Sequence, residues 1–233
     1  MIRLVFLLCF LTVLSSSFAQ SVVIAEDLRE EPERAFGMNR KHYTHTWVGL
    51  HFLVGPPETE GAEVLYGRSR ALEFGYRYKR RFSDVFSAGS ELSVRRSAFH
   101  IRQHSGKEVP DTIIHDKEKL VFLQAGAAIY QRVNFGQRGD YIGRFVDIGA
   151  YGAWNFHVRQ VTHDLLDNGE RLRSRRTRMD YPAAFEYGFM ARLGFNNFVL
   201  KGNYRISDLF SGSADLPELP RWSAGLEFGM HPY

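Results

Sequence analysis

The sequence has 233 residues, with 30 Lys and Arg against 26 Asp and Glu, a formal net charge of +4 and one cysteine. Its length suits a single domain with one sizeable core, and the mild excess of positive charge says little by itself. The slightly negative mean hydropathy argues against a helical membrane protein. It does not argue against strands that carry apolar side chains only at alternate positions.

Residues 1–19 have the features of a cleaved signal peptide. Arg3 gives the segment a positive start, an apolar run follows, and residues 17–19 (Ser-Phe-Ala) form a small-x-small cleavage site. Cys9 lies inside this segment, so the exported chain has no cysteine, which excludes a disulfide-stapled secreted scaffold and suits a bacterial envelope protein. Residues 20–42 follow as a charged periplasmic segment, which we expect to be mostly mobile.

From residue 43 onward, eight segments alternate apolar residues with glycine, polar or charged residues. Successive side chains of a strand point to opposite faces, so each segment presents one apolar face and one polar face. The segments are about as long as a tilted strand needs to cross a bilayer. They are residues 44–54, 70–80, 85–97, 120–133, 142–158, 181–195, 198–206 and 221–231.

The connections between these segments alternate between short and long. With both termini in the periplasm, every short turn falls on the periplasmic side and every long loop falls outside, as in bacterial single-chain barrels. The sequence therefore predicts an all-β fold, an eight-stranded antiparallel up-and-down transmembrane β-barrel over residues 43–233. The short links are 81–84, 134–140 and 196–197, and the long ones are about 55–69, 98–118, 159–180 and 207–220.

The face that carries the charge distinguishes a membrane barrel from a soluble one. A soluble ligand-carrying barrel puts its apolar face inward and its charges in water. Here glycine recurs on the charged face, where it would weaken a solvated strand but makes room in a narrow lumen for long charged side chains. The other face is rich in aromatic and branched residues, which suit lipid and its interfaces. We therefore expect the charged face to fill the lumen.

The lumen should then hold acids and bases together. Because buried charges must be paired, we favour a structural network of ion pairs over a conducting path or a proton relay, and we expect no wide pore. His45, His51 and His157 should also face the lumen as hydrogen-bonded structural residues. The predicted network consists of Glu73, Arg77, Glu91, Arg95, Arg132, Asp147, Glu186, Arg192, Lys201, Arg205 and Glu227.

The third long connection is the most informative loop. Residues 167–169 (Asp-Asn-Gly) are a strong hairpin turn signal, so the flanking strands are expected to continue beyond the membrane. The returning arm is rich in arginine, which would contact lipopolysaccharide phosphates or an acidic partner, or else form a solvated charged hairpin. These arginines are Arg171, Arg173, Arg175, Arg176 and Arg178.

In its layout, the chain resembles the small outer-membrane β-barrel families of Bacteroidota, the outer membrane protein beta-barrel domain group with its PorT-like members. The resemblance rests on the eight segments and on a last strand introduced by residues 216–221 (LPELPR) and closed by 225–229 (GLEFG). It implies a barrel in the bacterial outer membrane over residues 43–233. We expect outer-membrane lipid, lipopolysaccharide and envelope proteins as partners. The PorT-like resemblance implies a role as an accessory of type IX secretion or surface assembly.

The sequence predicts no catalytic site. His100, His104 and His115 share the second long connection with several carboxylates, and His163 lies in the third, but none has a spacing such as His-Glu-x-x-His. We therefore expect no enzyme activity, no cofactor and no metal, and nucleic acid is not expected as a partner of an exported barrel. The alternative is a lipid-modifying enzyme with its site at the extracellular rim.

Overall fold

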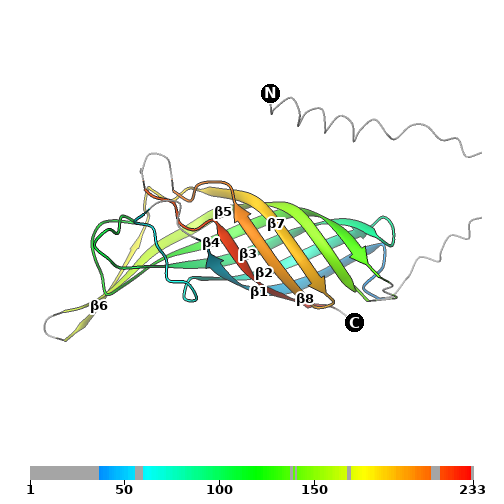
Figure 1. Ribbon diagram of the computed structural model, residues 1–233, viewed down its shortest axis with the longest axis horizontal. Coiled ribbons are helices and arrows are strands. Elements are labelled where there is room, and N and C mark those ends of the chain that lie inside the picture. The colour runs from blue at the N-terminus through cyan, green and yellow to red at the C-terminus, as the bar shows by residue number, and fades with distance from the viewer. Residues whose placement is uncertain are drawn as a thin grey trace, which may run out of the picture. The chain divides into compact units, whose positions relative to one another are not determined.

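The computed structural model describes residues 37–55, 60–136, 139, 141–166, 169–210 and 216–231. The predicted signal peptide, residues 1–19, and residues 20–36 of the predicted periplasmic segment lie outside this part of the chain. The described residues form nine strands (Figure 1): β1 (His42–Val54), β2 (Arg70–Arg81), β3 (Phe86–Ile101), β4 (Lys117–Phe135), β5 (Arg144–Leu165), β6 (Arg171–Thr177), β7 (Phe185–Phe195), β8 (Phe198–Arg205) and β9 (Trp222–Met230).

Eight of the nine strands close into a ring. The strands β1 to β5 pair in sequence order, β5 then pairs with β7, and β7, β8 and β9 follow in order. The ring closes where β9 pairs with β1, with Trp47 opposite Gly229 and Leu50 opposite Leu226. All of these pairs are antiparallel. The up-and-down barrel that the sequence predicts is confirmed.

The ninth strand, β6, lies outside the ring. It pairs only with residues 159–165 at the far end of β5, so β5 and β6 form a hairpin that projects beyond the barrel (Figure 1). The turn of this hairpin is closed by a hydrogen bond from the Leu166 amide to the Glu170 carbonyl of 2.9 Å. The predicted continuation of the strands as a hairpin is confirmed.

Burial alternates along the strands, but the faces are reversed relative to a soluble barrel: the apolar side chains are exposed and the charged ones are buried. On β7, Phe185 is 68% exposed whereas the neighbouring Glu186 is 5% exposed. The same pattern runs around the ring, because the large apolar side chains form an exposed outer belt while arginines and carboxylates are buried. An exposed apolar surface of this extent would be unfavourable in water but matches lipid, so the fold is a transmembrane β-barrel. In the described part of the chain, no helix is long and apolar enough to cross a membrane.

The two ends of the barrel differ. At the short-turn end, the connections are residues 82–85, 136–143 and 196–197, and Asn196 adopts a left-handed φ of 54° that suits a two-residue hairpin. At the long-loop end, the connections are residues 55–69, 102–116, 178–184 and 206–221. The strands β4 and β5, with 19 and 22 residues, extend beyond the outer belt toward the long-loop end.

The lumen is layered, with a charged middle between two apolar clusters. At the short-turn end, Tyr43, Ile142, Phe145 and Val199 form one cluster, and Met38 packs against it. The long loops fold inward at the other end and contribute many residues of the second cluster, which the sequence does not predict. This loop cluster consists of Leu53, Ala62, Val64, Phe99, Ile101, Val109, Leu120, Phe122, Leu209, Phe210 and Leu219.

A β-bulge places two residues of β5, His157 and Val158, on the faces opposite to those that the sequence predicts. Leu123 pairs with His157 and Gln124 pairs with Asn155, so Phe156 has no partner on β4. The extra residue reverses the alternation of side chains beyond it. As a result His157 is exposed instead of lining the lumen, and Val158 turns inward and packs against the loop cluster.

The start of β7 also differs from the prediction. Residues 181–184 lie in the connection before β7, although the sequence predicts that they extend the strand with Tyr181 facing outward. Tyr181 instead packs edge-on against Phe210, with ring centroids 5.8 Å apart. Pro182 lacks the amide hydrogen that a strand ladder needs, which favours an irregular connection here.

Candidate functional site

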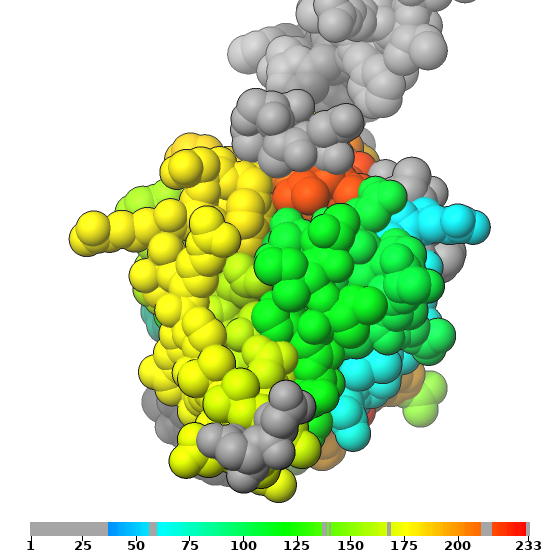
Figure 2. Space-filling model, turned by 90° about the vertical axis from the view of Figure 1, so that its left-hand side faces the viewer, coloured from blue at the N-terminus to red at the C-terminus, as the bar shows by residue number. Residues whose placement is uncertain are grey.

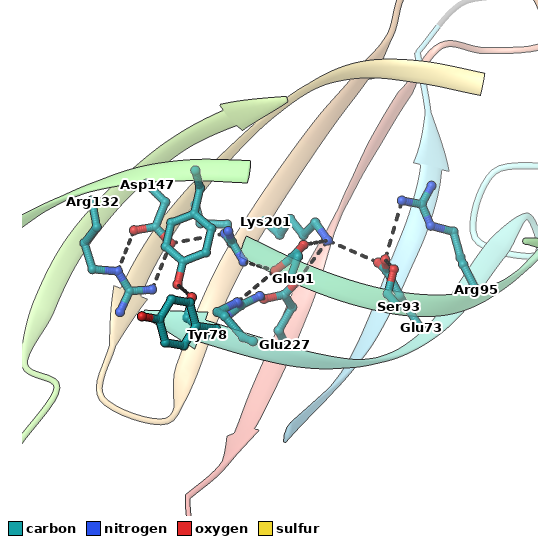
Figure 3. Close-up of polar contacts among 12 residues, drawn as sticks. Glu73, Tyr78, Glu91, Ser93, Arg95, Arg132, Asp147, Lys201 and Glu227 are labelled. Carbon is teal, nitrogen blue, oxygen red and sulfur yellow. Dashed lines mark hydrogen bonds and ion pairs between the residues drawn. The ribbon is translucent and has the colours of Figure 1, made fainter. Parts of the chain in front are cut away.

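Ten ionisable side chains occupy the charged middle of the lumen. Figure 3 shows polar contacts among several of them, including Glu91, Asp147 and Lys201. They project inward from seven of the eight ring strands, and acids and bases are equal in number, so the layer is neutral when all are charged. The carboxylates are Glu73, Glu91, Asp147, Glu186 and Glu227, and the bases are Arg77, Arg95, Arg132, Arg192 and Lys201.

The contacts begin near the short-turn end. Arg132 donates two hydrogen bonds to Asp147, of 2.7 and 2.9 Å, in the fork geometry that favours arginine–carboxylate pairs. Arg192 places its Nε 3.2 Å from the same Asp147 and donates from Nη1 to Glu91 at 2.6 Å. Arg192 therefore links the first pair to the centre of the layer.

Glu91 is the centre of the charged layer. It accepts a hydrogen bond of 2.8 Å from Arg77, which also donates to Glu227 at 2.8 Å. Lys201 lies 3.6 Å from Glu91, 3.1 Å from Glu227 and 3.2 Å from Glu73. Each of these groups has opposite charges on more than one side, as a buried charge requires.

The layer ends toward the long loops. Arg95 lies 3.6 Å from Glu73 and 3.4 Å from Glu186, and Ser93 donates to Glu73 at 2.8 Å. Arg205, which the sequence assigns to the same network, instead binds Glu218 at 2.8 Å. It also donates to the Leu219 carbonyl, so it fixes the 206–221 connection.

The two remaining predicted lumen histidines are buried. His51 places its Nε2 3.2 Å from Glu73, so it lies at the edge of the charged layer. His45 lies near the short-turn end, where its ring centroid is 4.6 Å from that of His231. Both histidines face the lumen, whereas His157 does not.

Aromatic rings fill the space between the lumen charges, and the sequence did not predict this. Trp47 is fully buried, with the guanidinium of Arg77 at 4.9 Å and the ammonium of Lys201 at 4.7 Å from its ring centroid. A Cβ atom at Gly75 would lie 2.6 Å from the Trp47 ring, and one at Gly194 would lie 2.0 Å from the Phe145 ring. The inward glycines at these positions make room for rings, not for long charged side chains as predicted.

We expect Gly75→Ala to lower the free energy of unfolding by about 1–3 kcal/mol, because the new methyl group overpacks the Trp47 ring between its two cations. The matched control is Gly202→Ala, since a Cβ atom there meets no other atom within 4 Å. Urea unfolding of the protein refolded in detergent micelles measures both. Equal midpoints for the two variants would contradict the packing described here.

Neither of two clusters with metal-ligand residue types supports a metal site. His51, Glu73 and Glu227 form one, and Asp111, His115 and Glu118 form the other. A lysine ammonium already lies against the carboxylates of each: Lys201 in the first, as described, and Lys107 in the second, 2.5 Å from Glu118 and 3.4 Å from Asp111. The ammonium supplies the positive charge that a metal would bring.

Two of the four loop histidines, His104 and His115, hold the long loops in place. His104 pairs with Glu63 at 2.8 Å, and His115 lies 2.9 Å from Asp164 of β5. The buried ammonium of Lys107 also binds the Ile113 carbonyl, so the 102–116 connection is tied to itself and to the barrel. These contacts give His104 and His115 structural roles. Figure 2 shows that the β3–β4 connection (green) lies against the β5–β6 region (yellow) at this end.

The five arginines of the third long connection do not form one cluster. Directly paired residues share a face of a sheet, so Arg173 and Arg175 lie on the outer face of the hairpin, opposite His163 and Val161. Arg171, opposite Leu165, lies on that face too, nearer the turn. Arg176, opposite Gln160, lies on the inner face, and Arg178 follows the strand with a left-handed φ of 59°.

Comparisons with known proteins show a distant likeness only. The sequence matches no described protein family and no curated protein. Two similar solved structures are both of Ail, the attachment invasion locus protein of Yersinia pestis. One is 14% identical with a TM-score of 0.37, covering 82% of this chain and 99% of that chain. The other, in complex with the heparin analogue sucrose octasulfate, is 12% identical with a TM-score of 0.34, covering 80% and 97%.

At these sequence identities and TM-scores, the fold assignment depends on the strand pairing and burial described above. It does not depend on the likeness to the Ail structures. The resemblance to the Bacteroidota barrel families is not shown by any of these matches and stays a prediction.

Proposed function

We propose that this protein is an integral outer-membrane β-barrel that acts by binding other envelope components, with its lumen closed. The layered lumen carries this proposal, because ion pairs cross-link its middle and apolar clusters cover both ends. An eight-stranded barrel is only wide enough to be filled by side chains. Such a barrel does not act as a general diffusion pore, and its outer and loop surfaces remain for function.

The long-loop end has the properties of a binding platform. The loop cluster and the Lys107 contacts hold the long loops in one arrangement, which lowers the entropy lost when a partner binds. Exposed apolar side chains lie on this platform, including Tyr66, Ile113 and Ile114. Such residues favour a protein partner, so a role as an accessory of secretion or surface assembly is our specific hypothesis.

Fractionation and conductance measurements test the barrel and its closed lumen. We expect the protein in the outer-membrane fraction, with a gel mobility that shifts on boiling, and no stable open channel in planar bilayers. Recovery as a soluble periplasmic protein without a mobility shift would contradict the membrane assignment. A large steady conductance would contradict the closed lumen.

The platform is tested by Ile113→Asp and Ile114→Asp together. These exposed side chains are expected to tolerate the change in the folded barrel, so the mobility shift on boiling should persist. Affinity purification of the intact envelope complex should then lose the proteins that copurify with the unaltered chain. Unchanged copurification would show that partners bind elsewhere.

The enzymatic alternative gains no support from His104 and His115, since both are engaged in holding the loops. We expect the mass spectrum of lipid A to be the same in cells with and without the protein. A lipid A modification that depends on the protein would favour the enzyme instead.

A further inference from the structure

A cationic surface lies on the outside of the barrel, separate from the charged layer of the lumen. We name it the cationic wall and define it as Arg70, Arg96, Lys119, Arg159, Arg173 and Arg175. Cross-strand pairing places these residues on the outward face. Lys119 pairs with Val161, which in turn pairs with Arg175, and Arg96 pairs with the outward-facing Leu72. The wall therefore runs across β2, β3, β4, β5 and β6.

The charges of the wall are close enough to repel one another. Lys119 shares a row with Arg175 through Val161, and it lies two positions from Val121, the partner of Arg159. In the charged middle of the lumen, by contrast, each cation has an acid beside it. Within the described ranges, no carboxylate oxygen lies within 4.0 Å of the six cations of the wall.

One donor in the wall is buried without a partner. The Nε atom of Arg159 is buried and has no hydrogen-bond acceptor among the described residues. An unsatisfied buried donor is unfavourable, and a charged one more so. The wall as it stands therefore lacks the negative charge and the acceptor that would stabilise it.

The position of the wall identifies where that negative charge would come from. Arg96 follows the lipid-facing Val94 by two residues, and Arg70 precedes the lipid-facing Leu72 by two. Because a strand rises about 3.3 Å per residue, these cations lie within roughly 7 Å of the apolar belt along the strand. Arg159 likewise follows the exposed Trp154 and Phe156. This is the depth at which lipid headgroups meet the barrel.

We propose that the cationic wall binds the phosphate groups of lipid A molecules that pack against the barrel from the side. The proposal rests on the outer-membrane function proposed above. Guanidinium groups present paired donors that match phosphate oxygens, and several cations in one patch match a headgroup with two phosphates. Bound phosphate would supply negative charge beside Arg159 and reduce the repulsion around Lys119.

Adjacent arginines of β6 give a matched pair of variants. Arg175 belongs to the wall, whereas Arg176 lies on the opposite face of the same strand, across from Gln160. Both side chains are exposed, and both substitutions to Gln remove one positive charge. Any difference between the variants therefore reports the face of the hairpin and not its net charge.

The experiment measures the binding of bisphosphorylated lipid A to the purified barrel in detergent by native mass spectrometry. We expect Arg175→Gln to weaken binding about fivefold and the triple variant Arg96→Gln, Arg159→Gln, Arg175→Gln by at least about tenfold. Arg176→Gln should bind like the unaltered protein. Phosphate-free lipid A should bind the unaltered protein as weakly as bisphosphorylated lipid A binds the triple variant, and added salt should weaken the stronger interaction.

Three results would overturn the proposal: equal binding by the triple variant, equal binding of phosphate-free lipid A, or an equal loss in Arg176→Gln. The gel mobility shift on boiling is measured for every protein in parallel. If the unaltered chain shows no shift, the outer-membrane barrel itself is wrong. If all variants shift normally and lipid binding does not change, only the assignment of the wall is wrong.

Discussion

Glu91→Leu is expected to lower the free energy of unfolding of the barrel by roughly 3–5 kcal/mol. Glu91 is 4% exposed and contacts Arg192 at 2.6 Å, Arg77 at 2.8 Å and Lys201 at 3.6 Å. Its removal leaves these cations close together in a layer that apolar clusters separate from water. Urea midpoints of the protein refolded in detergent micelles, followed by the gel mobility shift, measure the loss.

Glu186→Leu is the matched comparison, since it removes a carboxylate from the edge of the same layer. Its ion pair with Arg95 is longer, at 3.4 Å, and Arg95 keeps Glu73 as a second partner at 3.6 Å. We therefore expect a smaller loss than for Glu91→Leu. If Glu91→Leu were as stable as the unaltered protein, Glu91 would not be the centre of a buried charge network.

Phe189→Arg is expected to lower the free energy of unfolding in lipid vesicles by about 2–4 kcal/mol, the effect of an arginine near the bilayer midplane. Phe189 is 58% exposed and lies near the middle of the outward row of β7, opposite Ala150 and Tyr204. Its exposed surface meets lipid, so a charge there loses its hydration. Urea unfolding from vesicles measures the difference.

The control for this prediction is Phe189→Leu, which keeps an apolar side chain against lipid and should change stability little. In a soluble barrel the same site would face water, and arginine would be tolerated there. Equal midpoints for Phe189→Arg and Phe189→Leu would therefore show that this face does not contact lipid.

The fold could be predicted from the sequence because its main signal is local. The alternation on β7, from Phe185 to Phe195, depends only on the geometry of an extended chain, and the inward placement of Glu186 and Arg192 follows from it. The alternation of short and long connections then orders the strands. Neither inference requires knowledge of contacts between distant residues.

The partners of each charge could not be predicted, because they depend on register and on distance across the lumen. Glu186 and Arg192 lie on one strand, yet Glu186 contacts Arg95 and Arg192 contacts Glu91 and Asp147. In the same way, Trp47 meets Gly75 only because the two are opposite each other on β1 and β2. Periodicity within one strand carries none of this information.

The bulge at Phe156 and the loop cluster were missed for different reasons. Phe156 continues the outward apolar alternation, so nothing in its own strand marks the extra residue opposite Leu123 and Gln124. The loop cluster did leave a signal, since Val64 and Leu209 are apolar residues within the predicted long connections. The cationic wall left one too, because Arg96 and Lys119 continue the outward faces of their strands past the apolar belt.

The longest-range ion pairs of the lumen also make the full pairing of its charges depend on completion of the barrel. Glu91 and Arg192 are separated by 101 residues, Glu73 and Lys201 by 128, and Arg77 and Glu227 by 150. An unfinished sheet that lacks β7, β8 and β9 would carry the acids and bases of its first strands without these partners. Such an intermediate is disfavoured in the bilayer until the last strand pairs with the first, so the charged layer favours insertion of the ring as a single cooperative unit.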